Sequence, residues 1–437
     1  MTSGNRELAS RIVFALRGRG FQAYFVGGCV RDLLLRLEPE DYDVATDATP
    51  EQILEIFPKA ELVGAHFGVV LVKEGERAVE VATFRSEGAY SDGRRPGEVT
   101  LVREPREDAR RRDFTINAMF LDPVSNQVLD FFSGLDDLDR GLLRAVGEPA
   151  ARFAEDHLRM LRAVRFAARF GFTVEAATFE AIRAAAPAIR RISAERIRAE
   201  LNRILTEGGA SRGLRLLDET GLLAEVLPEV KALQGVEQPP EFHPEGDVWT
   251  HTLLMLDRLQ EPTVTLAWGA LLHDIGKPAT FERLDRIRFN GHVDAGAKIA
   301  RRILARLKFS LEEQERILAL IENHMRFADV RRMKESTLKR FLRLPHFEEH
   351  LELHRADCLA SHGHLDNWEY ARERFQNAPA EALRPPRLLT GRDLMAMGYE
   401  QGPRLREILE AVETAQLEGE IGQAEEARAF VRERFPL

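Results

Sequence analysis

The pattern of apolar residues changes near residue 150, and this change restricts the folds that the chain can adopt. Before it, a predicted amphipathic helix at Glu7–Arg17 is followed by short apolar runs with strand-like alternation. The predicted strands lie near residues 23–27, 42–46, 69–73, 79–84, 118–122 and 128–132. After it, long Ala/Arg/Leu/Glu segments interrupted by glycines predict helices alone. The sequence therefore predicts an α+β fold, in which a head with a mixed β-sheet and flanking helices precedes an all-helical remainder.

Length and proline content predict how the chain divides into domains. A chain of 437 residues is long enough for two or more domains with separate cores. Gln238–Pro244 contains three prolines, which exclude a regular helix, and a second boundary is predicted at Pro379–Pro386. We expect a head, a helical neck and body, a further helical domain and a helical tail, over residues 1–145, 146–238, 239–378 and 379–437.

The charge of the chain is unevenly distributed. A net charge of -9 does not by itself indicate a nucleic-acid-binding protein. Arginines nevertheless cluster within Arg94–Arg112, Arg159–Arg169 and Arg190–Arg203, which predicts basic stripes on an acidic body. For any single cluster, a solvated helix face is the alternative interpretation.

The sequence predicts a cytoplasmic protein that does not enter a membrane. Its two cysteines, Cys29 and Cys358, are far apart and lack a Cys-x-x-Cys spacing, so neither a disulfide framework nor a thiolate zinc site is expected. The first residues carry charges where a signal segment would be apolar, and no run approaches the roughly 18 apolar residues of a membrane-spanning helix.

A glycine pair follows the first predicted strand and opens a helix. Because Gly27 and Gly28 lack side chains, the backbone there can approach a phosphate group closely. Arg31 then lies in the first helical turn, where backbone amides and the helix dipole attract anions. Asp41 and Asp43 follow on the next predicted strand, where alternation places both carboxylates on one face. The combination predicts a site for nucleotide phosphates and Mg2+, whereas Asp-x-Asp alone is more often a solvated turn.

A third carboxylate is predicted in the same sheet. Glu80 lies between apolar neighbours in the predicted strand at 79–84, where an acidic side chain needs a partner or a metal ion. Beside Asp41 and Asp43 it would complete a cage for two Mg2+ ions, one activating an RNA 3′-hydroxyl and one binding a triphosphate. The alternative is an ordinary surface-facing strand residue.

Four segments resemble, in order, the motifs of class II tRNA nucleotidyltransferases. This family comprises CCA-adding enzymes, separate CC-adding and A-adding enzymes, and bacterial poly(A) polymerases. The four segments are Gly27–Thr46, Arg111–Ala118, Arg152–Ala163 and Ile192–Ile197. One departure is Arg36, because the family usually has glycine at the end of the first helix; the change affects the local turn and removes no ligand.

The resemblance implies roles for individual residues. The implied catalytic and Mg2+-binding residues are Asp41, Asp43 and Glu80. The implied nucleotide-binding residues are Gly28, Arg31, Arg112, Asp113, Asn117, Glu155, Asp156, Arg159 and Arg162. Among these, Arg112 and Asp113 are expected near the ribose and phosphates of the incoming nucleotide, and Glu155, Asp156 and Arg159 are expected to select its base.

Selection of the base also follows from the chemistry of two side chains. Asp156 and Arg159 are three apart in the predicted helix, hence neighbours on one face that offer an acceptor beside a donor. Cytosine and adenine each present an amino donor beside a ring-nitrogen acceptor, which matches this pair. Uracil and guanine present the reverse order, and each unpaired polar group would cost about 1 to 3 kcal/mol. The pair therefore predicts acceptance of CTP and ATP; an ordinary helix salt bridge is the alternative.

Two further segments indicate which family member the chain resembles. Arg85–Arg111, which includes Asp92–Pro96, resembles a loop that CCA-adding and A-adding enzymes keep and CC-adding enzymes shorten. Val63–Val70 has the pattern of the CCA-adding branch rather than that of poly(A) polymerases. We expect addition of C, C and A to the 3′ end of tRNA from CTP and ATP, with addition of the terminal A alone as the alternative.

The third region carries a second set of metal ligands. His273 and Asp274 follow an apolar helix predicted at Val264–Leu272, and the set resembles that of HD-domain phosphohydrolases. The implied primary ligands, for a divalent metal such as Ni2+, Co2+ or Mn2+, are His251, His273, Asp274 and Asp357. The candidates for substrate contact or a second ion are His292 and His324. We expect hydrolysis of phosphate esters by a metal-activated water; a helical domain that only supports tRNA binding is the alternative.

An alternative interpretation, from another functional class, is that hydrolysis is the main activity of this chain and that its head only binds RNA. The repelling carboxylates of the head argue against it, because a binding module has no use for them.

Overall fold

The computed structural model describes residues 2–63, 68–88, 99–241 and 243–437. The chain forms two compact units, Met1–Lys231 and Ala232–Leu437. Within the described ranges, none of the helices combines the length and the apolar character that crossing a membrane requires.

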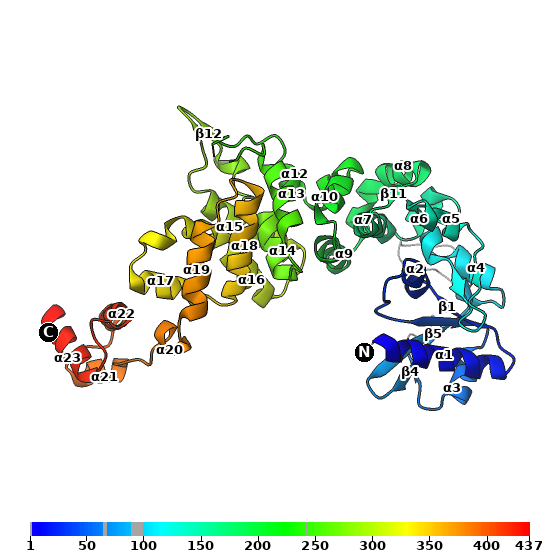
Figure 1. Cartoon of the computed structure of the whole chain (residues 1–437), viewed down its shortest axis with the longest axis horizontal. Helices are drawn as coiled ribbons and strands as arrows, with labels where there is room; N and C mark the ends of the chain where they lie inside the picture. Colours follow the sequence, from blue (N-terminus) through cyan, green and yellow to red (C-terminus); the bar gives the residue numbers. More distant parts are fainter. Residues whose placement is uncertain (1, 64–67, 89–98, 242) are drawn as a thin grey trace. The chain divides into compact units, whose positions relative to one another are not determined.

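The first unit begins with a seven-stranded mixed β-sheet in the order β3-β4-β5-β2-β1-β8-β9 (Figure 1). The strands are Ala23–Val26 (β1), Asp43–Thr46 (β2), Glu61–Leu62 (β3), Val69–Glu74 (β4), Arg77–Thr83 (β5), Phe120–Leu121 (β8) and Val128–Leu129 (β9). β2 and β5 are parallel, and the other neighbours in this sheet are antiparallel. The predicted mixed sheet is confirmed.

Helices on one face of this sheet explain the parallel pair. After β2 the chain forms α3 (Pro50–Ile56) and then returns to the sheet through β3 and β4. A reciprocal capping box between Thr49 and Gln52 begins α3. α1 (Thr2–Gly18) contacts β1, β2, β5 and α3, and Figure 1 shows α1 and α3 together beside the sheet. The strand order therefore places the beginning of β2 next to β5.

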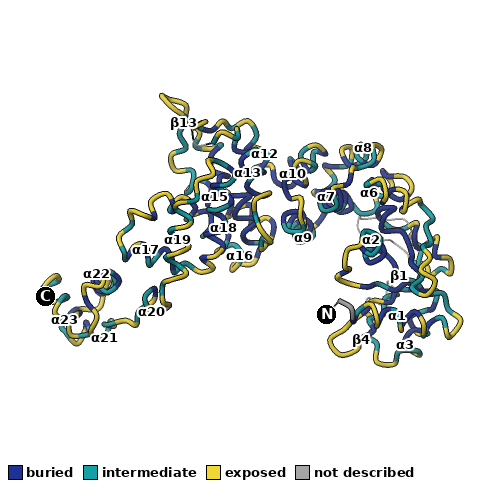
Figure 2. Tube along the Cα trace, in the orientation of Figure 1, coloured by how far each residue is buried: buried dark blue, intermediate teal, exposed yellow. Residues whose placement is uncertain are grey.

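The rest of the first unit is built around one buried helix. α7 (Leu158–Phe170) has 10 of its 13 residues buried, so neighbours surround it on most sides (Figure 2). α9 (Ala194–Thr206) and α10 (Ala210–Glu219) pack on it. Gly209 has a φ of 72°, and a Cβ there would lie 2.4 Å from the carbonyl oxygen of Ala168. Only glycine permits this close approach.

The chain after residue 150 is not entirely helical, contrary to the prediction. β11 (Thr173–Val174) pairs in parallel with β10 (Leu142–Leu143). β12 (Glu282–Arg283) and β13 (Ile287–Arg288) form a hairpin. Each of these strands has two residues, which is too short for an alternating pattern to identify it.

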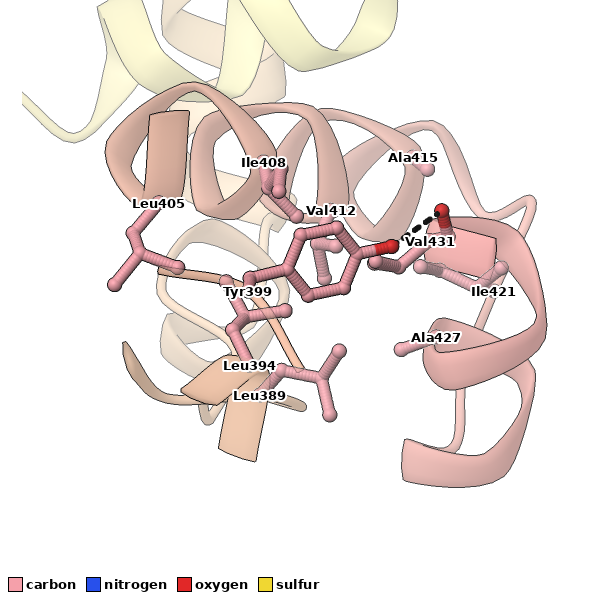
Figure 3. Packing of buried hydrophobic residues seen from close by; sticks show 10 residues of the cluster. All are labelled: Leu389, Leu394, Tyr399, Leu405, Ile408, Val412, Ala415, Ile421, Ala427 and Val431. Atoms are coloured by element: carbon pink, nitrogen blue, oxygen red, sulfur yellow. Dashed lines mark hydrogen bonds between the residues drawn. The ribbon is translucent and has the colours of Figure 1, made fainter. Parts of the chain in front are cut away.

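The second unit is a helical body followed by a tail. The helices of the body are Val248–Arg258 (α13), Val264–Leu272 (α14), His292–Arg306 (α15), Leu311–Asn323 (α16), Glu335–Leu342 (α17), Phe347–Ala360 (α18) and Asp366–Asn377 (α19). The helices of the tail are Ala380–Leu383 (α20), Gly391–Ala396 (α21), Pro403–Glu418 (α22) and Ala424–Arg434 (α23). The last three tail helices share a hydrophobic core around Tyr399 (Figure 3). The Tyr399 hydroxyl donates to the carbonyl oxygen of Phe435 at 2.5 Å, so this core buries no unpaired hydroxyl.

Arg36 occupies a position that suits glycine. The residue follows α2 (Gly28–Leu34) with a φ of 60°, in the left-handed region. The Leu37 N–H donates to the Asp32 carbonyl at 2.8 Å and the Arg36 N–H to the Leu33 carbonyl at 3.1 Å, which is the pattern of a Schellman cap. The turn is therefore formed despite the side chain, as expected from a departure that affects only local geometry.

We predict that Arg36→Gly stabilises the first unit by about 1 kcal/mol, because an L-residue in the left-handed region is strained. Urea unfolding of the full chain measures the shift. Arg36→Ala is the matched control, since it removes the exposed guanidinium and keeps the strain. Equal midpoints for Arg36→Gly and wild type would contradict the assignment of strain.

Candidate active sites

Two of the three predicted head carboxylates occupy adjacent strands. β2 begins at Asp43, whose partner in the parallel register of β5 is Glu80. Asp41 lies two residues before β2 and is exposed, as is Glu80, whereas Asp43 is half-buried. Burial first, and then the charges of Glu80 and Asp41, raise the pKa of Asp43 to about 6 against the opposing effect of Arg112. In the described part of the head, the three do not form a group of oxygens all within 4.8 Å of one another.

Gly27 brings the backbone against this site. Its φ is 76°, and a Cβ there would lie 3.1 Å from Nη1 of Arg112 and 3.8 Å from Oδ2 of Asp43. A side chain would therefore crowd the space between a guanidinium and a carboxylate. Arg112 is held there by Asp108, which accepts its Nη2 at 3.1 Å. The glycine, the cation and the carboxylate thus meet at one place.

Asp113 is the centre of a buried polar network. Its Oδ1 accepts from Nδ2 of Asn117 at 3.0 Å, and its Oδ2 accepts from Nε of Arg162 at 2.8 Å. The Asn117 amide oxygen in turn accepts from Nη1 of Arg31 at 2.7 Å. Although burial alone would raise the pKa of Asp113, Arg162 and Asn117 hold it well below its ordinary value. These four predicted nucleotide-binding residues are thus brought together and bonded to one another.

The single helix predicted across Arg152–Ala163 is wrong. α6 (Pro149–Glu155) ends before Asp156, which has an extended backbone with φ −142° and ψ 106°, and α7 begins two residues later at Leu158. The Oδ1 of Asp156 accepts the Leu158 N–H at 3.0 Å, a local bond that competes with helical hydrogen bonding. Asp156 and Arg159 are therefore not neighbours on one helix face.

Separate partners hold the side chains that were predicted to select the base. Arg159 donates to Oε2 of Glu155 at 2.6 Å and to the carbonyl oxygen of Arg111 at 3.1 Å. Asp156 accepts through Oδ2 from Nη2 of Arg196 at 2.7 Å. Arg196 lies on α9 and was not predicted as a site residue, although it falls in one of the four resembling segments. No spacing links it to Asp156, because the two are 40 residues apart.

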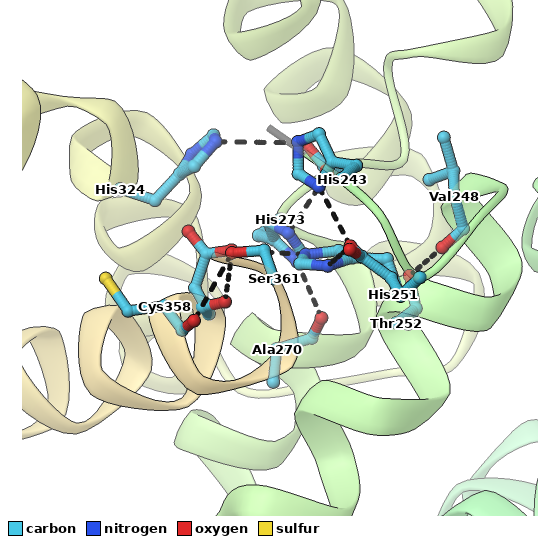
Figure 4. A network of polar contacts seen from close by, with 12 residues as sticks. His243, Val248, His251, Thr252, Ala270, His273, His324, Cys358 and Ser361 are labelled. Carbon is cyan, nitrogen blue, oxygen red and sulfur yellow. Dashed lines mark hydrogen bonds and ion pairs between the residues drawn. The ribbon is translucent and has the colours of Figure 1, made fainter. Parts of the chain in front are cut away.

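The second unit brings together three of the predicted primary metal ligands. His251 lies on α13, His273 follows α14, and Asp357 lies on α18, with one ligand atom from each within 4.8 Å of the others. His251 Nε2 lies 3.1 Å from Oδ1 of Asp357. The fourth, Asp274, places its Oδ2 3.1 Å from Nε2 of His273. Figure 4 shows the two histidine rings side by side.

The orientation of the His251 and His273 rings suits metal binding. Nδ1 of His273 lies 2.8 Å from the carbonyl oxygen of Ala270, which only accepts, so Nδ1 donates there and Nε2 faces the other ligands. Nε2 of both His251 and His273 is buried, and each lies 3.1 Å from a carboxylate oxygen, that of Asp357 and that of Asp274 respectively. Two imidazole nitrogens with nearby carboxylates are the donor set of a divalent transition metal, so the residues fit one.

His292 and His324 form a second group with Asp274. Their Nε2 atoms lie 3.7 and 3.9 Å from Oδ1 of Asp274 and 3.4 Å from each other. Each Nδ1 faces a backbone carbonyl, so both Nε2 atoms carry lone pairs. Burial lowers the pKa of His324 to about 4, so this ring is neutral at neutral pH. Asp274 therefore faces both groups, one with each oxygen.

Three residues beside these ligands were not predicted: His243, Glu245 and Lys277. Glu245 accepts from Nδ1 of His251 at 2.7 Å and from Nδ1 of His243 at 2.9 Å, which fixes the His251 tautomer. Lys277 donates to Oδ2 of Asp274 at 2.6 Å. Glu245 follows the proline-rich segment, where no periodicity indicates which way a side chain points.

A cavity of about 1360 Å³ opens beside these ligands within the second unit. Its lining includes His292, His324 and Asp357, together with the cationic Lys277, Arg286 and Arg288. The cavity is large enough for a nucleotide-sized ligand, and its cations suit a phosphate.

Two segments used to distinguish members of the family fall partly or wholly outside the described residues. They are Asp92–Pro96 and, within Val63–Val70, residues 64–67.

We predict that Asp43→Asn stabilises the metal-free protein above pH 6. A carboxyl whose pKa rises from 3.8 to about 6 on folding destabilises the fold when ionised; this penalty is absent below pH 3.8 and complete above about pH 6. Urea midpoints of variant and wild type in metal-free buffer, from about pH 7.5 down to about pH 4.5, measure it. The advantage should shrink as the pH falls, and Glu55→Gln, an exposed carboxylate on α3, should give none. A pH-independent advantage would contradict the assignment.

Family models match three parts of the chain. They are the poly A polymerase head domain over residues 23–144, the probable RNA and SrmB-binding site of polymerase A over residues 171–234, and the HD domain over residues 247–360.

Relatives match along nearly the whole chain. The CCA-adding enzyme of Streptococcus pneumoniae strain CGSP14 is 31% identical over 431 residues, which are 98% of this chain and 97% of the relative. That of Streptococcus sanguinis strain SK36 is 43% identical over 249 residues, 55% of this chain and 62% of the relative, so that alignment spans less than two thirds of its length.

Solved structures agree with these matches. The crystal structure of the Bacillus stearothermophilus CCA-adding enzyme in complex with CTP has a TM-score of 0.76 and 31% identity, covering 98% of this chain and 96% of that one. The Thermotoga maritima CCA-adding enzyme complexed with tRNA has a TM-score of 0.60 at 20% identity, covers 97% of this chain and 95% of that one, and shares the fold. With a full-length relative above 30% identity, this chain belongs to the family of CCA-adding enzymes, and it is a nucleotidyltransferase.

Proposed function

We propose that this chain adds C, C and A to the 3′ end of tRNA from CTP and ATP, by template-independent phosphoryl transfer. The observation that carries the proposal is the register of Asp43 with Glu80 beside Gly27 and Arg112. Burial first, and then the charges of Glu80 and Asp41, raise the pKa of Asp43, so the protein does not fully compensate its charge. The residues therefore fit divalent cations. Because the proposed substrates are tRNA, CTP and ATP, the proposed location is the cytoplasm.

Asp41, Asp43 and Glu80 are the proposed Mg2+ ligands of the head. When bound, Mg2+ supplies activation of the RNA 3′-hydroxyl and neutralisation of the triphosphate. The backbone at Gly27 and Gly28 leaves room for the phosphates, and Arg112 adds positive charge beside them. The chain thus positions the reacting groups, which is the main contribution of a protein to phosphoryl transfer.

The proposed selection of the base rests on Asp156 as an acceptor and Arg159 as a donor. Cytosine and adenine match this order, and uracil and guanine oppose it with both groups. The two side chains do not need to share a helix face. Arg196 holds the carboxylate, and Glu155 holds the guanidinium.

Addition assays with three RNAs test the proposal. We predict that tRNA lacking CCA gains three nucleotides with CTP and ATP, that tRNA ending in CC gains one with ATP, and that an unrelated RNA gains none. Addition to the second RNA alone would identify an A-adding enzyme, and long A tails would identify a poly(A) polymerase.

Asp43→Ala is the control for this assay. It should abolish addition while tRNA binding, measured separately, stays intact, because the carboxylate acts on the reacting groups. Retained addition would remove the metal-ligand assignment.

We also propose a hydrolase site in the second unit, with a metal held by His251, His273, Asp274 and Asp357. The buried Nε2 atoms of His251 and His273, each 3.1 Å from a carboxylate oxygen, favour it. When bound, such a metal supplies a nucleophilic water at neutral pH. His292 and His324 are the proposed ligands of a second ion or of the substrate phosphate. Arg286, Arg288 and Lys277 line the cavity where that phosphate would bind.

We predict that purified protein with added Ni2+, Co2+, Mn2+ or Mg2+ hydrolyses 2′,3′-cyclic nucleotides or phosphate esters. His273→Ala and Asp274→Ala should lose hydrolysis and retain less metal by mass spectrometry, because each removes a ligand. Asp257→Ala, an exposed carboxylate on α13, is the matched control. Hydrolysis no greater than that of the two ligand variants would leave a domain that only supports RNA binding.

A further inference from the structure

Asp156 is held by side-chain contacts rather than by a helix. It lies in the break between α6 and α7, where its backbone is extended, so its side chain lies on the face of neither of these two helices. Two donors determine where its oxygens point: the Leu158 N–H on Oδ1 at 3.0 Å and Nη2 of Arg196 on Oδ2 at 2.7 Å. The first donor is local and belongs to the backbone. The second comes from another helix and is therefore the one that the sequence can change.

Arg196 is committed to this contact. It lies in the first turn of α9, and its ion pair with Asp156 leaves the two side chains 26% and 17% exposed. Its second terminal nitrogen, Nη1, is buried without a hydrogen bond among the described residues. The guanidinium is thus largely buried beside Asp156, the acceptor that is proposed to read the base, and is not a fully solvated surface charge.

A buried ion pair fixes the place of α9 along α7. Arg165 on α7 donates to Glu200 on α9 at 2.7 Å, and both side chains are almost fully buried. Glu207, at the end of α9, accepts from Arg165 at 3.1 Å and from Arg169 at 3.3 Å. Because breaking a buried pair is costly, sliding of α9 against α7 is opposed. Arg196 therefore meets Asp156 at a fixed position.

We propose that Arg196 is a positioning residue that determines nucleotide selectivity, by holding the Asp156 carboxylate in the orientation in which it accepts the amino group of cytosine or adenine. This inference rests on the proposed selection of the base by Asp156 and Arg159. Without the guanidinium, the carboxylate keeps only one fixed oxygen and rotates away from the base more readily. Discrimination then falls even though neither selecting side chain has changed.

A double-mutant cycle tests the inference. The readout is the ratio of kcat/KM for CTP to that for UTP, and for ATP to that for GTP, at saturating tRNA. Arg196→Ala should lower these ratios about tenfold, the effect of one lost hydrogen bond of about 1.4 kcal/mol. In the Asp156→Ala background the same substitution should lower them no further, because Arg196 acts through Asp156. Arg203→Ala, which removes an exposed arginine from the same helix, should leave them unchanged.

Arg196→Lys and thermal unfolding separate selectivity from folding. Lysine keeps a charge but not the planar fork, so it should restore part of the discrimination. Two results would overturn the inference. One is that Arg196→Ala keeps the wild-type ratios of kcat/KM; the other is that Arg196→Ala lowers these ratios equally in the wild-type and the Asp156→Ala backgrounds. If Arg196→Ala does not fold, wild-type ratios in Arg196→Lys would overturn it in the same way, and an intermediate ratio would support it. A wild-type protein that adds neither C nor A would instead overturn the proposed function.

Discussion

The buried carboxylate of Asp113 joins the two halves of the head site. Through Arg162 it is bonded to α7, the helix that carries Arg159, and through Asn117 it is linked to Arg31 on α2, the helix that follows the glycine turn. Loss of one partner from such a network leaves a buried charge uncompensated, at a cost of several kcal/mol. The residues that would bind phosphate and those that would read the base are therefore parts of one rigid arrangement.

The pKa values of two aspartates in this arrangement are shifted in opposite directions. Arg162 and Asn117 hold the pKa of Asp113 well below its ordinary value, so its charge is already compensated by the protein. Burial and the neighbouring carboxylates raise the pKa of Asp43 to about 6, so its charge is not. The same residue type thus serves as a structural anchor in one place and is the proposed cation ligand in the other.

Features set by short stretches of chain could be predicted from the sequence. The glycine turn with α2, the mixed sheet and the bounds of α14 at Val264–Leu272 depend on local patterns, and the structure has all three. The break at Asp156 was not predicted: one contact that holds the residue there is local, from the Leu158 N–H, but the other comes from Arg196, 40 residues away. Glu245 was missed for a related reason: its side chain is directed by the fold of a proline-rich segment that has no period.

We propose that one site in the head accepts both CTP and ATP. Equilibrium binding with Mg2+ and no transition metal tests it most directly, with labelled CTP bound and unlabelled ATP, UTP or GTP added. If the site is shared, we expect one nucleotide bound per chain, complete displacement of CTP by ATP, and little displacement by UTP or GTP. Simultaneous binding of CTP and ATP, or equal displacement by all three competitors, would contradict it.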